Sequence, residues 1–237
     1  SYLLLKYVGG FNNQELAHIF KSWNEGELHS YLIGITAGIF READDLGDGE
    51  LIDRIKDSAK QKGTGRWASI EALKQGVDIS MITSACTARI MSNHLDEREK
   101  AWQLIHSPAV GLSPDKESFA AMVREALYTG KIIAYAQGFS LMQDASRLYG
   151  WNLDLGKIAS IFRAGCIIQA VFLNDITHAF EAEPKPESLI FDGFFLSRIN
   201  EHQDSLRQAV STGVMNGLPI PALCNAVSYL DEFRAKA

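Results

Sequence analysis

The stretch KIIAYAQGFSLM, residues 131–142, decides the fold class because it is apolar on nearly all sides. A helix of this kind lies inside a protein or in a large interface. Apolar residues recur at helical spacing along most of the chain, and no convincing run alternates between apolar and polar residues as a half-buried strand would. The sequence therefore predicts an all-α fold with this stretch at its centre.

The periodicity predicts ten helices, with approximate bounds 12–23, 27–42, 49–60, 66–75, 79–96, 115–148, 154–181, 188–200, 202–215 and 220–235. Residues that typically begin or end helices flank several of these ranges, namely Ser80, Asp115, Asp154, Gly76, Gly150 and Gly217. The opening segment SYLLLKYV is typical of the end of a helix whose beginning lies before Ser1.

The chain also repeats itself at a distance of about 141 residues. GVDISMITSAC at 76–86 matches GLPIPALCNAV at 217–227. The pair Leu32 and Ile35 returns as Leu173 and Ile176, in a second match at the same distance. A period this long indicates two half-domains packed together rather than a solenoid. We therefore predict one multi-helix domain over 1–237, built from two tandem pseudo-repeats at about 1–106 and 130–237.

Composition and motifs exclude several classes of protein. The 237 residues carry a formal net charge of −6 without a basic run, so nucleic acid is not an expected partner. No apolar run reaches the ~20 residues that span a bilayer, so no membrane partner is expected. The three cysteines lie far apart in apolar settings, which favours buried thiols in a reducing compartment over a disulfide framework or a metal site. The six histidines show no metal-ligand spacing. Neither a Walker A loop nor a dinucleotide-binding fingerprint is present.

The segment QKGTGRW, residues 61–67, has two interpretations. Glycines at 63 and 65 allow close approach of the backbone to an anion, while Lys62 and Thr64 supply an ammonium and a hydroxyl. Alternatively, it is a turn between helices with a solvated lysine. One repeat later the chain reads HQDSLRQ, so Lys62 and both glycines have no equivalent in the second copy.

Arg89 also departs from its counterpart. It stands where the second copy has Leu230, on the same helical stripe as Ile82 and Cys86, so we expect its side chain to point inward. A buried guanidinium needs an anion. That anion is either a protein carboxylate in a structural ion pair or a bound ligand, and the residues alone leave both open.

Several stretches together resemble one family. They are WNEGELHSYLIGIT, DSAKQKGTGRW, ALYTGKIIAYAQGFSLM, FRAGCII and STGVMNGLPIPALCNAVSYLD. In their order and spacing they resemble the C-terminal, all-helical domain of the 6-phosphogluconate dehydrogenase family, over essentially all 237 residues. Family members are cytoplasmic homodimers that use NADP to oxidise and decarboxylate 6-phosphogluconate to ribulose 5-phosphate in the pentose phosphate pathway.

The resemblance implies roles for three residues of this chain. Lys62, Thr64 and Arg89 match the residues that bind the substrate phosphate in the family. It also implies that the NADP-binding Rossmann domain and the general base and acid precede Ser1, and that a tail reaching the partner subunit follows Ala237. No catalytic, cofactor-binding or metal residue is therefore expected within 1–237, and this chain alone should lack dehydrogenase activity. Gln169 stands where the family commonly has arginine, so a local salt bridge is in doubt.

Two other functions remain alternatives. A related β-hydroxyacid dehydrogenase is one, although it would lack the second repeat and the K-G-T-G motif. A non-catalytic helical dimerisation module is the other, although it would have no use for a phosphate site.

Overall fold

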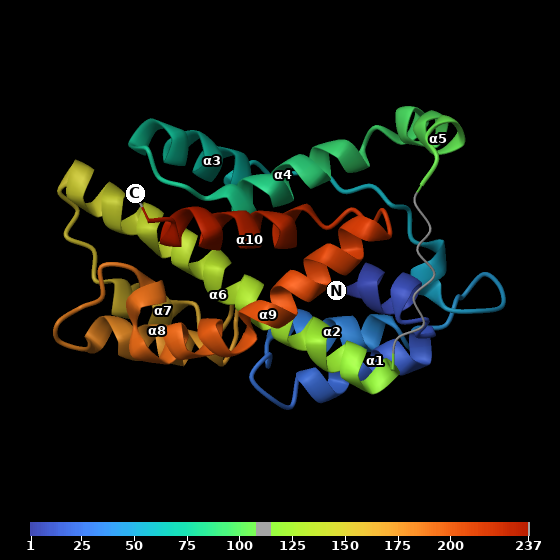
Figure 1. Cartoon of the computed structure of the whole chain (residues 1–237), viewed down its shortest axis with the longest axis horizontal. Helices are drawn as coiled ribbons and strands as arrows, with labels where there is room; N and C mark the ends of the chain where they lie inside the picture. Colours follow the sequence, from blue (N-terminus) through green and yellow to red (C-terminus); the bar gives the residue numbers. More distant parts are fainter. Residues whose placement is uncertain (108–114, 237) are drawn as a thin grey trace.

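The computed structural model describes residues 1–107 and 115–236, and these ranges are helical with no strand (Figure 1). The all-α prediction is confirmed. The α-helices are α1 Asn13–Trp23, α2 Tyr31–Ile39, α3 Thr64–Gln75, α4 Ser80–Ser92, α5 Leu95–Leu104, α6 Lys116–Tyr149, α7 Leu155–Ile161, α8 Phe172–Glu181, α9 Gly193–Met215 and α10 Pro221–Arg234. Three shorter helices are a π-helix at Leu4–Val8 and 3₁₀ turns at Leu51–Arg54 and Leu189–Phe191.

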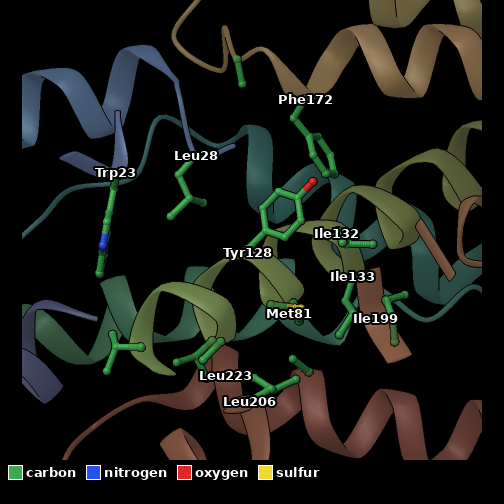
Figure 2. Packing of buried hydrophobic residues seen from close by; sticks show 14 of the residues in the cluster. Trp23, Leu28, Met81, Tyr128, Ile132, Ile133, Phe172, Ile199, Leu206 and Leu223 are labelled. Carbon is green, nitrogen blue, oxygen red and sulfur yellow. The ribbon is translucent and has the colours of Figure 1, made fainter. Parts of the chain in front are cut away.

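The long helix α6 is the axis of the molecule, and α9 packs along it. Ile132, Ile133 and Ala136 are fully buried, as predicted for the stretch at 131–142, and they belong to the core shown in Figure 2. The side chain of Asp115 caps the start of α6 by accepting from the amide of Ser118, and Gly150 ends it at φ 66°. The helix is therefore held at both ends by the residues that the sequence indicated.

Helices from the two halves of the chain pack around this axis. The pair α1 and α2 lies near one end of α6, the pair α7 and α8 lies toward the other, and α4 lies against α10 (Figure 1). Helices α4 and α10 begin alike: Ile79 has φ −130° and ψ 42°, and Ile220 has φ −119° and ψ 50°. Gly76 and Gly217 precede them with φ 71° and 65°. These likenesses support the predicted repeat, which itself stays a prediction.

Several predicted helices in the first half were wrong in extent. The helix predicted at 27–42 begins only at Tyr31, because the Ser30 hydroxyl caps it by accepting from the amide of Ile33. The helix predicted at 49–60 is absent apart from the single 3₁₀ turn at Leu51–Arg54. The helix predicted at 79–96 ends at Ser92, and Ile79 rather than Ser80 occupies its N-cap. Helix α5 was missed because none of its residues is buried, which leaves no apolar period to detect.

The second half shows two differences. The helix predicted at 154–181 is interrupted between α7 and α8, where Gly165 adopts φ 70° in a turn that separates the two. The helices predicted at 188–200 and 202–215 are instead a 3₁₀ turn at Leu189–Phe191 followed by the continuous helix α9. The carboxylate of Asp192 starts α9 by accepting from the amides of Phe194 and Phe195.

Candidate functional site

The K-G-T-G motif forms the start of helix α3. Gly63 has φ 103°, a left-handed conformation that favours glycine, and the helix begins directly after it, two residues earlier than predicted. The amide of Trp67 is the first to bond inside the helix, to the carbonyl of Gly63 at 2.9 Å. The amides of Thr64, Gly65 and Arg66 therefore lie at an uncapped N-terminus, an arrangement suited to an anion.

Gly65, the second glycine of the motif, allows close packing between two helices. A Cβ at Gly65 would lie 2.4 Å from Sγ of Cys86 on α4, far inside contact distance. Because glycine has no side chain, the first turn of α3 packs directly against the middle of α4. The two glycines thus fix both the direction of the chain at Lys62 and the closeness of the two helices.

An extended segment leads into this motif, and we name it the strap, residues 57–62. It lies along the C-terminal half of α4, where the side-chain amide of Gln61 donates to the carbonyl of Cys86 at 2.7 Å. The Nη1 group of Arg89 donates to the carbonyl of Lys60 at 3.3 Å. Arg89 therefore contacts the strap two residues before Lys62, which brings the predicted site residues into one region.

The inward orientation expected for Arg89 was wrong, since its side chain is exposed beside the strap. Its guanidinium donates to the backbone carbonyl of Lys60, and no carboxylate of the described residues pairs with it. The structural ion pair left open by the sequence is therefore not seen. Lys62 and Thr64 are exposed as well.

Positive charge gathers at this site without compensation. Lys60, Lys62, Arg66 and Arg89 form no ion pair within 4.0 Å among the described residues, although the whole chain is acidic. Other cations of the surface commonly do have partners, such as Lys116 with Glu15 at 2.7 Å. A group of unpaired cations beside free helix amides can bind a compact anion such as a phosphate.

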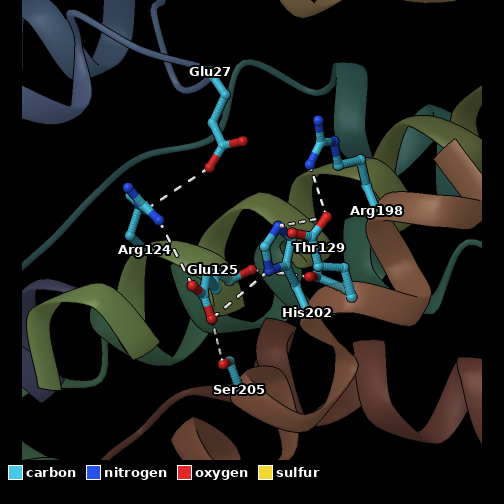
Figure 3. Close-up of polar contacts among 8 residues, drawn as sticks. Glu27, Arg124, Glu125, Thr129, Arg198, His202 and Ser205 are labelled. Carbon is cyan, nitrogen blue, oxygen red and sulfur yellow. Dashed lines mark hydrogen bonds and ion pairs between the residues drawn. The ribbon is translucent and has the colours of Figure 1, made fainter. Parts of the chain in front are cut away.

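A second polar cluster joins α6 to α9 (Figure 3). His202 is only 7% exposed, and its Nδ1 lies 3.7 Å from the carboxylate of Glu125. The hydroxyl of Ser205 donates to the same carboxylate at 2.6 Å. Because the carboxylate lies between groups of both helices, the cluster stabilises their packing.

A cavity of about 260 Å³ lies between α2, α6 and the turn before α8. It is lined mainly by apolar side chains, with Lys131, Tyr135 and Gln169 among them. Burial lowers the pKa of Lys131 to about 8, and its ammonium lies 5.3 Å from the centre of the Phe172 ring. Lys131 has no ion pair or hydrogen bond with another described side chain, so this part of the surface holds an uncompensated charge in an apolar setting.

Within residues 1–107 and 115–236, no three His, Cys, Asp or Glu side chains gather as a metal site would require. None of the helices in these ranges combines the length and apolar character needed to cross a bilayer. Cys86, Cys166 and Cys224 are free thiols and are only partly buried.

Some residues of this site had no obvious signal in the sequence. Ser92 at the end of α4 and Asn93 directly after it hold the strap, and the Ser92 hydroxyl accepts from the amide of Ala59 at 3.0 Å. The Asn93 amide donates to the carbonyl of Ala59 at 2.9 Å. A comparison of the two halves offers a hint, because the residues 141 positions later are Phe233 and Arg234, which share none of this chemistry.

Comparisons with known proteins concern the whole chain. The family model described as "6-phosphogluconate dehydrogenase, C-terminal domain" matches residues 1–237. Two curated relatives named "6-phosphogluconate dehydrogenase, decarboxylating" are the protein of Lactococcus lactis subsp. lactis, 45% identical over 236 residues, and that of Staphylococcus aureus strain N315, 43% identical over 235 residues. They cover 100% and 99% of this chain, which in turn covers 50% of each relative.

A solved structure is similar over the same length. It is described as Plasmodium falciparum 6-phosphogluconate dehydrogenase in its apo form, in complex with its cofactor NADP+ and in complex with its substrate 6-phosphogluconate. Its TM-score is 0.95 at 37% sequence identity, covering 100% of this chain and 51% of that one. The chain thus spans about half the length of the proteins it matches.

Proposed function

Because the chain belongs to the family of 6-phosphogluconate dehydrogenase C-terminal domains, we propose that it is the helical half of an NADP-dependent, decarboxylating 6-phosphogluconate dehydrogenase. Such an enzyme oxidises 6-phosphogluconate and releases CO2 to give ribulose 5-phosphate in the cytoplasm. In this proposal the other half supplies the NADP-binding Rossmann domain and the general base and acid. Residues 1–237 alone then have no dehydrogenase activity.

The part that this chain contributes is a site for the substrate phosphate. The observation that supports it is the group of unpaired cations, Lys62 and Arg89 among them, beside the free amides at the start of α3. A phosphate dianion would accept hydrogen bonds from the ammonium of Lys62, the guanidinium of Arg89 and the hydroxyl of Thr64. The ammonium acts as a point charge, and the guanidinium as a planar donor. The contacts of Lys62 and Arg89 neutralise charge that the described residues leave unpaired, and the neutral hydroxyl of Thr64 adds a hydrogen bond.

This site acts at a distance from the reacting carbons. The phosphate of 6-phosphogluconate does not change during the reaction, so binding it contributes orientation rather than chemistry. Holding one end of a flexible sugar acid restricts the positions open to the other end. Bound NADP+ supplies the hydride acceptor, and the helical half keeps the substrate in register with it.

The phosphate role is tested in the full-length enzyme with Lys62→Ala and Arg89→Ala. Loss of one charge-assisted contact costs about 1.5–3 kcal/mol, so we expect KM for 6-phosphogluconate to rise roughly 10- to 100-fold. KM for NADP should not change. Lys74→Ala, at the opposite end of the same helix α3, is the matched control. Normal substrate affinity in both site variants would remove the support for a phosphate site.

We also propose that the chain forms a homodimer through the outward face of α2. Leu32, Ile35 and Ile39 on that face are 46%, 39% and 39% exposed. Leu173 and Ile176 on α8, the counterparts of Leu32 and Ile35, are fully buried. Helix α2 has no charged residue, and a helix that is apolar all round is normally covered. A second copy of the chain would cover it, and this observation also keeps the non-catalytic dimerisation module as an alternative.

A further inference from the structure

The strap is held by hydrogen bonds rather than by buried side chains. None of its six residues is buried, and Asp57, Lys60 and Lys62 are exposed. Polar contacts are therefore needed to fix the register of the strap, that is, which of its residues lie against which residues of α4. Because Lys62 ends the strap and Arg89 stands on α4, the register of the strap sets the separation of these two cations.

Asn93 bonds to two neighbouring residues of the strap. Its side-chain amide donates to the carbonyl of Ala59 at 2.9 Å and to the carbonyl of Arg89 at 2.6 Å. Its side-chain oxygen accepts from the hydroxyl of Ser58 at 3.0 Å. One side chain therefore joins two strap residues to the backbone of the residue that carries the guanidinium.

Neighbouring groups strengthen this attachment. The Ser92 hydroxyl accepts from the amide of Ala59 at 3.0 Å and donates to the carbonyl of Arg89 at 2.8 Å. The guanidinium of Arg98 on α5 pairs with the carboxylate of Asp57 at 2.5 Å. Ser92 and Asn93 thus both link Ala59 to the carbonyl of Arg89, and of these two residues only Asn93 also bonds to Ser58.

The second half of the chain provides an independent comparison. The residues 141 positions after the strap, 198–203, lie inside the continuous helix α9. Ser58 corresponds to Ile199, which is 4% exposed and packs in the core, and Asn93 corresponds to Arg234. Where the chain stays helical, the polar attachment is replaced by apolar packing. The attachment therefore accompanies the extended strap and is not a general feature of this helical arrangement.

We propose that Asn93 is a positioning residue for the substrate phosphate: it fixes the strap on α4 and thereby the placement of Lys62 relative to Arg89. The residue touches no substrate itself. This inference rests on the proposed phosphate site, and it predicts that the identity of residue 93 determines how well the enzyme uses the phosphate of its substrate.

The test uses the full-length enzyme and compares two substrates, 6-phosphogluconate and gluconate, which lacks the phosphate. In Asn93→Ala we expect kcat/KM for 6-phosphogluconate to fall about tenfold, through a higher KM, because the three side-chain hydrogen bonds of Asn93 are lost. The kcat/KM for gluconate and the KM for NADP should stay within about twofold. Inorganic phosphate, used as a competitive inhibitor, should bind about tenfold more weakly.

Two further variants serve as controls. Asn225→Ala removes a side-chain bond to the carbonyl of Pro221, 2.8 Å long, on the helix α10 that packs against α4. It should leave the preference for 6-phosphogluconate over gluconate unchanged. Ser58→Ala removes only the hydroxyl that Asn93 accepts from, and should reduce that preference by a smaller factor. If Asn93→Ala does not fold, Ser58→Ala decides the question.

The possible outcomes are distinct. Equal losses for both substrates in Asn93→Ala would show a purely structural role and overturn the inference. An unchanged preference in Asn93→Ala, with a lower preference in Lys62→Ala, would also overturn it while leaving the phosphate site intact. An unchanged preference in Lys62→Ala would overturn the phosphate site and the positioning role together.

Discussion

At the scale of single residues, Gly65 decides how closely α3 approaches α4. In Gly65→Ala the new Cβ would overlap Sγ of Cys86, so one helix has to move. We expect the free energy of unfolding to fall by about 1–3 kcal/mol, as for other overpacked sites. Urea unfolding of the 237-residue chain measures this change.

The double variant Gly65→Ala/Cys86→Ala tests the cause. Removing Sγ makes room for the new methyl group, so the two substitutions should not be additive, and part of the lost stability should return. Gly38→Ala is the control, because a Cβ at Gly38 on α2 meets nothing within 4 Å. Strict additivity of the Gly65 and Cys86 effects would show that the contact is not the reason.

Lys131 gives the chain a pH-dependent stability. Burial lowers its pKa from 10.5 to about 8, so between these values the unfolded chain binds more protons than the folded chain. Stability therefore rises with pH across that window, and the full penalty is present below pH 8. We expect Lys131→Met to raise the free energy of unfolding at pH 7 by about 1–3 kcal/mol.

The gain from Lys131→Met should largely disappear near pH 10.5, where the lysine is neutral in the folded chain and about half neutral in the unfolded chain. Urea unfolding at pH 7 and at pH 10.5 measures the difference. Lys157→Met is the control, because Lys157 is 82% exposed and pairs only with Asp154 on the surface. A gain that is the same at both pH values would contradict the desolvation argument.

At the scale of helices, the buried polar cluster is part of what fixes α9 against α6. In Glu125→Ala the hydroxyl of Ser205 and the ring of His202 both lose the carboxylate beside them. Leaving such groups unsatisfied costs about 1–3 kcal/mol of unfolding free energy. Ser205→Ala, which removes one donor only, should cost less. Equal stability of Glu125→Ala and the parent chain in thermal unfolding would exclude this role.

The sequence predicted the helices that have one buried face and clear caps. Helix α6 is the best example, since the period of its apolar residues and the residues Asp115 and Gly150 agree. The region 49–60 was predicted helical because Leu51, Ile52 and Ile55 have helical spacing. Its chain is mostly extended instead, because the tertiary contacts from α4 satisfy the strap carbonyls of Ala59 and Lys60.

Only the residues of the candidate site that carry a signal in the sequence could be predicted. Lys62, Thr64 and Arg89 belong to local motifs or to an odd position in the repeat, and both kinds of signal are visible in the sequence. The exposure of Arg89 depends on the path of the strap, which no local pattern encodes. The role of Asn93 could not be predicted for a related reason, because its side chain bonds to strap residues more than thirty positions away.

At the scale of the whole molecule, the uncovered face of α2 predicts an assembly. Ile35→Lys places a charge in the middle of that face, where a second copy would have to bury it. We expect the variant to be monomeric under conditions where the parent chain is dimeric, as measured by sedimentation equilibrium. Ile161→Lys, at a residue that is 70% exposed on α7, is the control. A dimer that persists in Ile35→Lys would place the interface elsewhere.

The strap also affects how the protein responds to heat. Its contacts are polar and near the surface, whereas α6 and α9 share the buried core, so the two parts have different local free energies of opening. The strap can melt while the helices around α6 remain folded. We therefore expect heat to detach the strap reversibly before the helices denature. With the proposed phosphate site, a phosphate ligand would delay this step, because it would bind only while the strap is attached to α4.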